Sequence, residues 1–483
     1  MKNLMPPTQV NRGVLFLFIG ALFIFGPSLT GLLRAQSVSV DTLHKYGLYD
    51  TDRLPPSFHR DRRNAVREKM GSRTVALFLS APDRARANDI NYLYRQDANF
   101  YYLTGCLESH SALFISKSGM TMPDGETVHE VLFVQRRNPD EETWTGKRLG
   151  PNGAKSVLGF SYTLPIDSLP RFLKPYLAES DTLLFAPYDK QSTWPILDST
   201  LLVWETVKEK LAQRYPNLAV TPPTGILARL REIKSPEEIT LMRRAISISN
   251  EAHNEIMKKV RAGWHEYEMQ ALGEYIFAKN GAEYQGYPSI VGSGENSTIL
   301  HYESNRRKTE AGDFVEMDMG AEYHGYSADV TRSFPVDGHF TQEQASIYDL
   351  VYEAQEAGIR AAKVGNGFRA PNAEATTVIR NGLLKLGIIK DSTEYRKYFM
   401  HGTSHYLGLD VHDAGIYDTL TAGNVITVEP GIYIKAGSPC DPKWWNIGCR
   451  IEDDILITAN GPENLSAASP RKRSDVEKLM RAH

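Results

Sequence analysis

The sequence predicts two domains, an α/β domain followed by an α+β domain with an antiparallel sheet. Strand-like and helical segments alternate in the N-terminal half of the chain, which is typical of α/β folds. A well-capped helix opens the C-terminal half, and most segments after it are strand-like. The chain has 483 residues, which is more than a single hydrophobic core usually serves.

The first domain is predicted over residues 54–220. Strands are expected where aromatic and β-branched residues cluster, at 74–79, 99–103 and 131–134. Helices are expected at 203–214 and at 168–174, where Pro175 would end the shorter one. The run Pro-Pro-Thr-Gly at 222–225 is typical of a linker.

The second domain is predicted over residues 223–475. The run Ser235-Pro236-Glu237-Glu238 supplies an N-cap serine, a proline at the first helical position and a glutamate at the third, which is a capping box. Further helices are expected from Glu266 to Asn280, where a glycine follows, and over 342–363. Strands are expected at 314–319, 328–334, 425–428, 432–434 and 450–457.

Residues 1–35 have the pattern of an export signal. Lys2 and Arg12 precede an apolar run at 13–25, and Ala35 offers a small residue at the cleavage site. We therefore expect an exported protein, periplasmic or extracellular. The alternative is an uncleaved membrane anchor through residues 13–33, because that longer stretch could span a bilayer.

The composition excludes several classes of protein. Apolar residues make up 41% and charged residues 23% of the chain, which is typical of a folded globular protein and excludes a polytopic membrane protein. Residues 1–35 hold three basic residues and no acidic one, so their removal changes the net charge from −3 to −6. A mildly acidic chain of this kind predicts no nucleic-acid partner.

The three cysteines leave two possibilities open. An odd number in an exported protein leaves at least one free thiol. Cys440 and Cys449 are close enough in the sequence to form a disulfide, or both could be free. No Cys-x-x-Cys motif occurs, so a thiolate zinc site is not indicated.

Four acidic residues occupy positions where acids are normally avoided. Asp318 lies in an apolar strand, and Asp329 follows eleven residues later, past glycines that fit a hairpin. Glu429 ends another apolar strand, and Glu452 follows Arg450 at a spacing that places both side chains on one face. The alternative is that each acid is separately salt-bridged or exposed. If the four converge, their mutual repulsion predicts two bound divalent cations.

Histidines near glycine turns and strand ends support a metal site. They are His301, His401, His405 and His412. His401 and His405 are four residues apart, as on a zinc-binding helix, but Gly402 replaces the glutamate of that motif. A lone histidine is more often structural than a ligand. One histidine with four carboxylates is an oxygen-rich set that suits Mn²⁺ best, and a pair of such ions supports hydrolysis.

At these residues the sequence resembles the aminopeptidase P (Xaa-Pro aminopeptidase) branch of the pita-bread metallopeptidases, over nearly all the chain after about residue 54. The resemblance implies a creatinase/prolidase-like α/β N-terminal domain and an α+β pita-bread catalytic domain. The motifs that carry it are Tyr94-Arg-Gln-Asp-Ala-Asn-Phe-Tyr-Tyr-Leu-Thr-Gly105, Met317-Asp318-Met-Gly320, Ala328-Asp329-Val-Thr-Arg332, His401-Gly-Thr-Ser-His405, Val428-Glu429-Pro-Gly431 and Arg450-Ile-Glu452-Asp-Asp454.

The resemblance also implies the reaction and its cofactors. Such an enzyme hydrolyses the bond between an N-terminal residue and a following proline, by attack of a hydroxide held between two divalent metal ions, here expected to be Mn²⁺. Its substrates are peptides with proline at the second position, and the family tends toward dimers or tetramers. The implied metal ligands are Asp318, Asp329, His405, Glu429 and Glu452.

The remaining implied roles concern proton transfer and substrate binding. Glu429 would also shuttle the proton of the attacking hydroxide. His301 and His412 would hydrogen-bond the substrate and the oxyanion. Arg450 would orient Glu452 or touch the substrate, and His401 would lie behind the metal ligands.

Two alternative functions share most of these residues. A prolidase uses the same ligands but cuts only Xaa-Pro dipeptides. A non-catalytic pita-bread binding protein, or a metal-free hydrolase such as creatinase, would typically lose metal ligands, whereas all five positions here carry the expected residue types. The loop at 436–447 departs from the family pattern and is expected to shape the substrate entrance.

Overall fold

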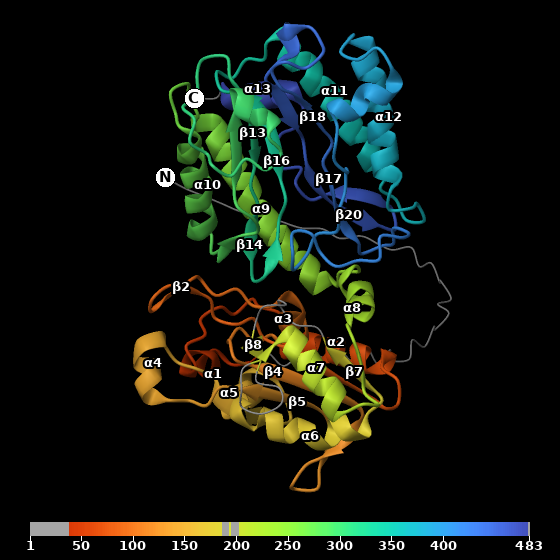
Figure 1. The fold of residues 1–483 in the computed structure, drawn as a ribbon. Helices are drawn as coiled ribbons and strands as arrows, with labels where there is room; N and C mark the ends of the chain where they lie inside the picture. Colours follow the sequence, from red (N-terminus) through yellow and green to blue (C-terminus); the bar gives the residue numbers. More distant parts are fainter. Residues whose placement is uncertain (1–37, 186–192, 195–201, 482–483) are drawn as a thin grey trace, which may run out of the picture. The chain divides into compact units, whose positions relative to one another are not determined.

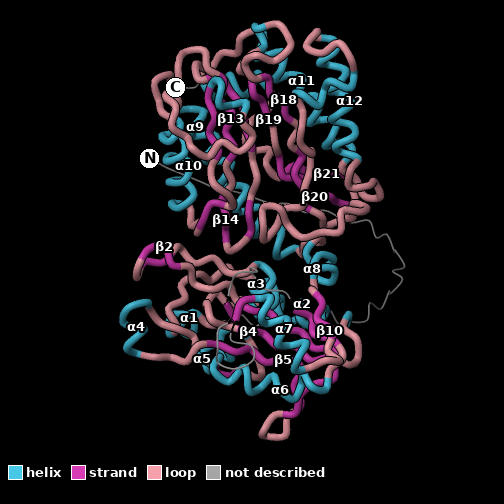
Figure 2. The backbone as a smooth tube through the Cα atoms, viewed as in Figure 1, coloured by secondary structure: helices cyan, strands magenta, loops and turns pink. Residues whose placement is uncertain are grey.

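A computed structural model of the protein describes residues 38–185, 193–194 and 202–481. The predicted export signal lies outside these residues. Within them, no helix combines the length and the apolar character needed to cross a membrane. The described residues form an N-terminal α/β part and a C-terminal α+β part, which confirms the predicted fold class (Figures 1 and 2).

The N-terminal part is built on a mixed six-stranded sheet with the order β10-β7-β1-β4-β5-β6. The central strand β1 pairs antiparallel with β4 and parallel with β7. The strands are β1 (Thr74–Leu79), β4 (Ala112–Thr121), β5 (Thr127–Val134), β6 (Thr163–Pro165), β7 (Thr182–Phe185) and β10 (Ala219–Thr221). Two short hairpins accompany the sheet, β2 (Ala85–Ala87) with β3 (Ile90–Asn91) and β8 (Thr193–Trp194) with β9 (Leu202–Val203).

Helices cover both faces of this sheet. Since side chains alternate along a strand, Ala76 and Phe78 of β1 face one helical layer, while Val75 and Leu77 face the other. The first layer contains α2 (Pro56–Lys69), α3 (Ala98–Thr104) and α5 (Gly150–Leu158). The second contains α6 (Leu169–Glu179) and α7 (Trp204–Arg214). The short helices α1 (Val40–Lys45) and α4 (Pro139–Thr145) complete this part.

The strand predicted at 99–103 is wrong, because this segment is the helix α3. Asp97 caps the helix by accepting a hydrogen bond from the Phe100 amide at 2.7 Å, and Gly105 ends it in the left-handed conformation with φ of 67°. These two caps outweigh the strand propensity of the aromatic run. The predicted end of α6 at Pro175 is also wrong, since the helix continues to Glu179 with the proline inside it.

Helices lie on both sides of the strands in the C-terminal part (Figure 1). The capping box at Ser235 is present and opens α9 (Pro236–Lys259), and α10 (Glu266–Lys279) ends two residues before Gly281, as predicted. On the other side lie α11 (Gln342–Ala361) and α12 (Ala370–Lys385). The helix α8 (Thr224–Arg231) begins inside the predicted linker, and α13 (Arg473–Met480) closes the described chain.

Every strand pair in the C-terminal part is antiparallel. The pairings follow the orders β12-β13-β16, β11-β14-β15, β17-β20-β21 and β18-β19. Their bounds are β11 (Tyr284–Gln285), β12 (Ile290–Ser293), β13 (Phe314–Asp318), β14 (Ala321–Tyr323), β15 (Tyr326–Ser327), β16 (Thr331–Pro335), β17 (Val425–Val428), β18 (Gly431–Ile434), β19 (Ile447–Arg450), β20 (Asp453–Thr458) and β21 (Gly461–Asn464).

Two predicted strands are interrupted at acidic residues. The strand expected at 328–334 begins only at Thr331, so that Asp329 lies just before it. The strand expected at 450–457 is two strands, β19 and β20, which are separated at Glu452. Both acids therefore stand where the backbone leaves the sheet. Of the two possibilities for the cysteines, the structure has the free form for all three.

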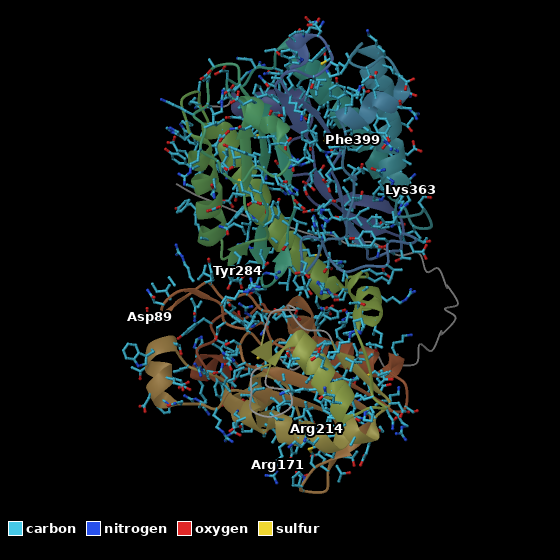
Figure 3. The ribbon with its side chains drawn as sticks, viewed as in Figure 1. Asp89, Arg171, Arg214, Tyr284, Lys363 and Phe399 are labelled. Carbon is cyan, nitrogen blue, oxygen red and sulfur yellow. The ribbon has the colours of Figure 1, made fainter. Side chains whose placement is uncertain are left out.

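Side chains connect the N-terminal and C-terminal parts directly. The hydroxyl of Tyr284, labelled in Figure 3, donates a hydrogen bond to the backbone carbonyl of Tyr94. Arg53 forms an ion pair with Glu283 at 2.8 Å. These contacts place the N-terminal part beside the elements that carry the site.

Candidate metal centre and active site

Two paired strands bring the first two acids to one end of a sheet. Asp318 is the last residue of β13, and it lies opposite Thr331 in β16. Asp329 precedes Thr331 by two residues, so its side chain reaches the same end. The β14–β15 hairpin joins the two strands, which confirms the predicted hairpin.

Glu429 and Glu452 come from a second antiparallel pair. Glu429 follows Val428, the last residue of β17, which pairs with Asp453 at the start of β20. Glu452 directly precedes Asp453. Its amide donates a hydrogen bond to the Thr331 carbonyl at 3.2 Å, and Thr331 Oγ1 donates to its Oε2 at 2.6 Å. The two strand pairs therefore meet at Thr331.

The residues predicted from the sequence converge on one open cavity of about 510 Å³. Four carboxylates, four histidines and one arginine contribute to its wall: Asp318, Asp329, Glu429, Glu452, His301, His401, His405, His412 and Arg450. The alternative that the four acids are exposed or paired at separate places is therefore excluded.

His405 lies at the centre of the acidic group. Its Nε2 is 3.3 Å from Asp329 Oδ2 and 3.5 Å from Glu429 Oε1. Its Nδ1 lies 3.0 Å from the carbonyl oxygen of Tyr406, which can only accept, so Nδ1 carries a proton. In the neutral ring Nε2 then carries the free lone pair, which is directed at the carboxylates, as in metal-binding histidines.

The donor set fits divalent cations. Ligand atoms of Asp329, His405 and Glu452 all lie within 4.8 Å of one another. Asp318 and Glu429 line the same cavity beside them, so that four carboxylates and one imidazole are available. Four negative charges in a buried site match the charge of two divalent ions, and oxygen with one nitrogen is the chemistry that such ions prefer.

Comparisons with known proteins agree with this geometry. Residues 240–459 match the model of metallopeptidase family M24, and residues 59–185 match the N-terminal domain of aminopeptidase P. The Xaa-Pro aminopeptidase of Escherichia coli is 39% identical over 87% of this chain and 96% of its own length. The chain belongs to the aminopeptidase P family of metallopeptidases.

Solved structures of this family have the same fold. The E. coli aminopeptidase P with the inhibitor Pro-Leu superimposes with a TM-score of 0.80 and 36% identity, over 89% of this chain and 99% of that one. A zinc-substituted form of the same aminopeptidase P in complex with product gives the same values. The likeness therefore covers the N-terminal and C-terminal parts together.

Burial and mutual repulsion favour the protonated form of the carboxyls in this aminopeptidase P site. Burial raises the pKa of Glu429 to about 7, and the charge of Asp329 adds to this against the opposing charge of His405. Burial and Asp329 also hold the pKa of Glu452 well above its usual range. Burial lowers the pKa of His405, but the hydrogen bond with Asp329 and the charges of Glu429 and Asp329 together outweigh burial and raise that pKa to about 9. Bound cations would replace these protons.

Arg450 is the permanent cation of the site. Its Nη2 lies 2.7 Å from Asp318 Oδ2, and its Nη1 lies 2.8 Å from Glu316 Oε1 and 2.8 Å from the Tyr433 hydroxyl. The sequence predicted that it would orient Glu452 or touch the substrate. It contacts Asp318 directly, and its Nε donates at 3.1 Å to Thr331 Oγ1, the hydroxyl that donates to Glu452, so it is linked to Glu452 through Thr331. Both Arg450 and Glu452 line the cavity, as their spacing indicated, and a contact of Arg450 with the substrate stays a prediction.

Sequence reasoning missed two residues at Asp318. Glu316 is fully buried two residues earlier in the same strand, and this acid on the face of Asp318 was a visible signal. The Tyr287 hydroxyl donates a hydrogen bond to Asp318 Oδ1 at 2.5 Å. No local pattern marks Tyr287, because it lies 31 residues before its partner in the sequence.

The other histidines form two parts of the wall. The His412 ring lies 4.3 Å from the His405 ring, measured between centroids, and His301 is exposed in the same cavity. His401 Nε2 lies 2.9 Å from the Tyr433 hydroxyl, and burial lowers the pKa of His401 to about 4. His401 therefore lies between Tyr433 and Glu429, whose Oε2 is 3.7 Å from its Nδ1, while His412 packs against His405.

Proposed function

We propose that this chain is a metal-dependent exopeptidase that removes the N-terminal residue from peptides whose second residue is proline. The observation that carries the proposal is the convergence of His405 with four carboxylates in one open cavity. Membership of the aminopeptidase P family supports the substrate class, since its E. coli relative is an Xaa-Pro aminopeptidase. The preference for longer peptides over dipeptides is part of the proposal.

The proposed cofactors are two divalent cations, held by Asp318, Asp329, His405, Glu429 and Glu452. When bound, such a pair of ions activates a water molecule and polarises the scissile carbonyl. We propose Mn²⁺ as the physiological ion, because carboxylate oxygens dominate the set. These five side chains would hold the ions, and Arg450 would orient Asp318 through its 2.7 Å contact with Oδ2.

Glu429 is proposed to move the proton in this reaction. Its carboxylate stands at the cavity wall, 3.5 Å from His405, so it faces the space in which the attacking water would lie. It would take a proton from the attacking water and deliver it to the proline nitrogen as the peptide bond breaks. Both steps use the same side chain.

His301 and His412 are proposed to bind the peptide. Both rings reach into the cavity, so each can donate a hydrogen bond to a substrate carbonyl or to the oxyanion that develops from it. Donors that are in place before the reaction stabilise the developing charge with little reorganisation, and each typically lowers the activation barrier by a few kcal/mol. Burial and the charge of His405 lower the pKa of His412, so it is neutral and donates through a single N–H at neutral pH.

The test is release of the first residue from an Xaa-Pro-Xaa tripeptide. The protein is stripped of metal and then given Mn²⁺, with an Xaa-Ala-Xaa tripeptide, an Xaa-Pro dipeptide and the variant Glu429→Gln measured alongside. Mn²⁺-dependent cleavage of the Pro tripeptide, lost in the variant, is the expected result. Cleavage of the dipeptide alone would indicate a prolidase, and no cleavage with any metal would overturn the proposal.

We also propose that the protein is exported and assembles with copies of itself. Residues 1–35 carry the signal-like pattern, and N-terminal sequencing of protein from fractionated cells would distinguish cleavage after Ala35 from an intact anchor. Leu93 and Trp144 of the N-terminal part are 84% and 89% exposed, so both side chains are available for a contact with another copy of the chain. Light scattering of the purified protein would give the oligomeric state, and a monomer would contradict this assignment.

A further inference from the structure

The segment from His405 to Asp413 is a closed loop with a histidine of the site at each end. The amide of Asp413 donates a hydrogen bond to the carbonyl of Tyr406 at 2.8 Å, which closes the loop. The ring centroids of His405 and His412 are 4.3 Å apart as a result. The position of His412 in the cavity is therefore set by the conformation of this loop.

A buried carboxylate fills the inside of the loop. A Cβ atom added to Gly408 would lie only 2.2 Å from Asp413 Oδ2, so the backbone closes directly around this side chain. Arg231 Nη2 contacts Asp413 Oδ1, and Lys234 Nζ lies 2.9 Å from Oδ2. The side chains of Asp413, Arg231 and Lys234 are 1%, 3% and 1% exposed, so this ion cluster is shielded from solvent.

Arg231 is the last residue of α8 and Lys234 lies in the connection to α9, and neither lines the cavity. Burial alone would raise the pKa of Asp413, but Arg231 and Lys234 hold it below its usual range, so the carboxylate is charged. A buried ion pair adds little net stability compared with apolar residues, but its geometry is directional. The cluster therefore fixes one conformation of the loop.

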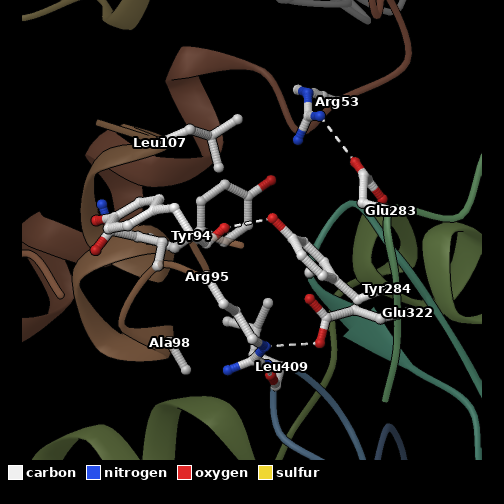
Figure 4. A pocket seen from close by; sticks show the side chains of 12 residues that line it. Arg53, Tyr94, Arg95, Ala98, Leu107, Glu283, Tyr284, Glu322 and Leu409 are labelled. Carbon is white, nitrogen blue, oxygen red and sulfur yellow. Dashed lines mark hydrogen bonds and ion pairs between the residues drawn. The ribbon is translucent and has the colours of Figure 1, made fainter. Parts of the chain in front are cut away.

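The N-terminal part holds the same loop from another side. Arg95 Nη2 donates a hydrogen bond to the carbonyl of Leu409 at 2.6 Å, while its Nε pairs with Glu322 at 2.8 Å (Figure 4). Arg231 Nη1 donates to Asn99 Oδ1 at 2.7 Å. Arg95 of the N-terminal part thus contacts the loop directly, and Asn99 contacts Arg231, which holds Asp413 in the loop.

We propose that Asp413, held by Arg231 and Lys234, is a positioning residue that sets the place of the His412 imidazole relative to His405, and that Arg95 ties the N-terminal part to this task. The proposal rests on the proposed function, in which His412 hydrogen-bonds the substrate. A displacement of about 1 Å in such a donor can lower the rate about a hundredfold.

The test is a double-mutant cycle on the full chain loaded with Mn²⁺. Asp413→Asn keeps the shape of the side chain and removes its charge. The values of kcat, KM and bound metal are measured for wild type, for Asp413→Asn, for His412→Ala and for the double variant. We expect kcat to fall at least about tenfold in the wild-type background and less than about twofold in the His412→Ala background, with metal content unchanged. Equal losses in both backgrounds would overturn the proposal, because the charge would then act on something other than His412.

A crystal structure of Asp413→Asn gives a readout that does not depend on activity. We expect the His412 ring to be displaced from its place beside His405, and an unchanged ring would overturn the proposal. If wild type cleaves no peptide, the proposed function fails, and this comparison still decides whether Asp413 positions His412. The two failures are therefore distinguishable.

Arg95→Lys is the second variant, in case Asp413→Asn does not fold. It keeps the charge beside Glu322 but loses the hydrogen bond to the Leu409 carbonyl, so kcat is expected to fall about three- to tenfold, again only where His412 is present. The matched control is Arg243→Lys, because Arg243 pairs with Glu463 at the surface, where both side chains are 45% exposed. The control is expected to leave kcat within about twofold of wild type. A kcat of Arg95→Lys inside the same range would contradict the role of the N-terminal part.

Discussion

The guanidinium of Arg450 lies between two buried carboxylates, 2.7 Å from Oδ2 of Asp318 and 2.8 Å from Oε1 of Glu316. A single permanent cation thus serves a candidate metal ligand on one side and an acid outside the ligand set on the other. Glu316 has no other ion-pair partner within the described residues, and burial raises its pKa to about 8. The arginine therefore matters to the fold as well as to the site.

Removal of this cation is expected to destabilise the protein strongly. Arg450→Met removes the cation that both Glu316 and Asp318 contact, so Glu316 takes up a proton and the buried ion pairs are lost, which typically costs about 3–5 kcal/mol. The measurement is urea unfolding of the metal-free protein at pH 7.5. The double variant Arg450→Met/Glu316→Leu should recover part of the loss, since a buried carboxyl group without its partner is replaced by an apolar side chain. A single variant within about 1 kcal/mol of wild type would show that the pair is not important for folding.

Metal binding is expected to reverse the effect of one substitution on stability. Without cations, Glu452 is repelled by Asp329, so Glu452→Gln should raise the free energy of unfolding of the chelated protein at pH 7.5. With saturating Mn²⁺ the same variant should be less stable than wild type. A ligand at a hundred times its Kd raises the free energy of unfolding of wild type by about 2.7 kcal/mol, and the variant, which lacks one ligand, should gain less. Thermal unfolding in EDTA and in Mn²⁺ measures both. The same order of stabilities in both conditions would mean that Glu452 does not bind the ions.

The candidate site was largely predictable because its acids stand out locally. Asp318 and Glu429 interrupt or end apolar strands, and an unpaired acid in such a strand is rare enough to predict a site. The hairpin between Asp318 and Asp329 then places two of the acids together. Convergence with the second strand pair depends on Thr331 and Glu452, which are 121 residues apart, and no local pattern encodes that contact.

What the sequence could not predict depends on long-range contacts or on caps. Tyr287 reaches Asp318 only after the strands have paired. The segment at 99–103 has strand composition but becomes a helix, because Asp97 and Gly105 cap its two ends. Propensity is a weak guide wherever a capping side chain and a left-handed glycine act together.

The hydroxyl of Tyr433 is expected to connect Arg450 with His401. It lies 2.8 Å from Arg450 Nη1 and 2.9 Å from His401 Nε2, so it accepts from the arginine and donates to the neutral imidazole. Tyr433→Phe leaves both partners with unmet hydrogen bonds in a buried place, and we expect a loss of about 1–3 kcal/mol of stability. Unfolding in urea measures it.

The control for that substitution is Tyr176→Phe, since the Tyr176 hydroxyl makes only a 3.5 Å contact with the Thr121 carbonyl near the surface. That variant should unfold within about 0.5 kcal/mol of wild type. If the free energies of unfolding of the two variants differ by less than about 0.5 kcal/mol, the hydroxyl of Tyr433 contributes no more to stability than an exposed hydroxyl.

Acid is expected to destabilise the N-terminal part through His59. Burial lowers the pKa of His59 from 6.5 to about 4, and the charges of Arg63 and Arg62 act in the same direction, while Nδ1 donates to the Tyr102 carbonyl at 3.0 Å. Because the folded-state pKa is the lower one, the unfolded chain binds the proton first. Stability is therefore lost as the pH falls from about 6.5 toward about 4. Between pH 7.5 and 5.0 this one group should cost about 2 kcal/mol.

The variant His59→Asn tests this assignment, because its amide can donate to the same carbonyl but cannot titrate. Urea unfolding of metal-free wild type and variant at pH 7.5 and 5.0 gives the two pH differences, and the variant's difference should be smaller by about 2 kcal/mol. His253, whose pKa burial lowers to about 3, leaves the variant with a remaining loss in the same direction. Equal pH differences in both proteins would place the proton uptake at a group other than His59.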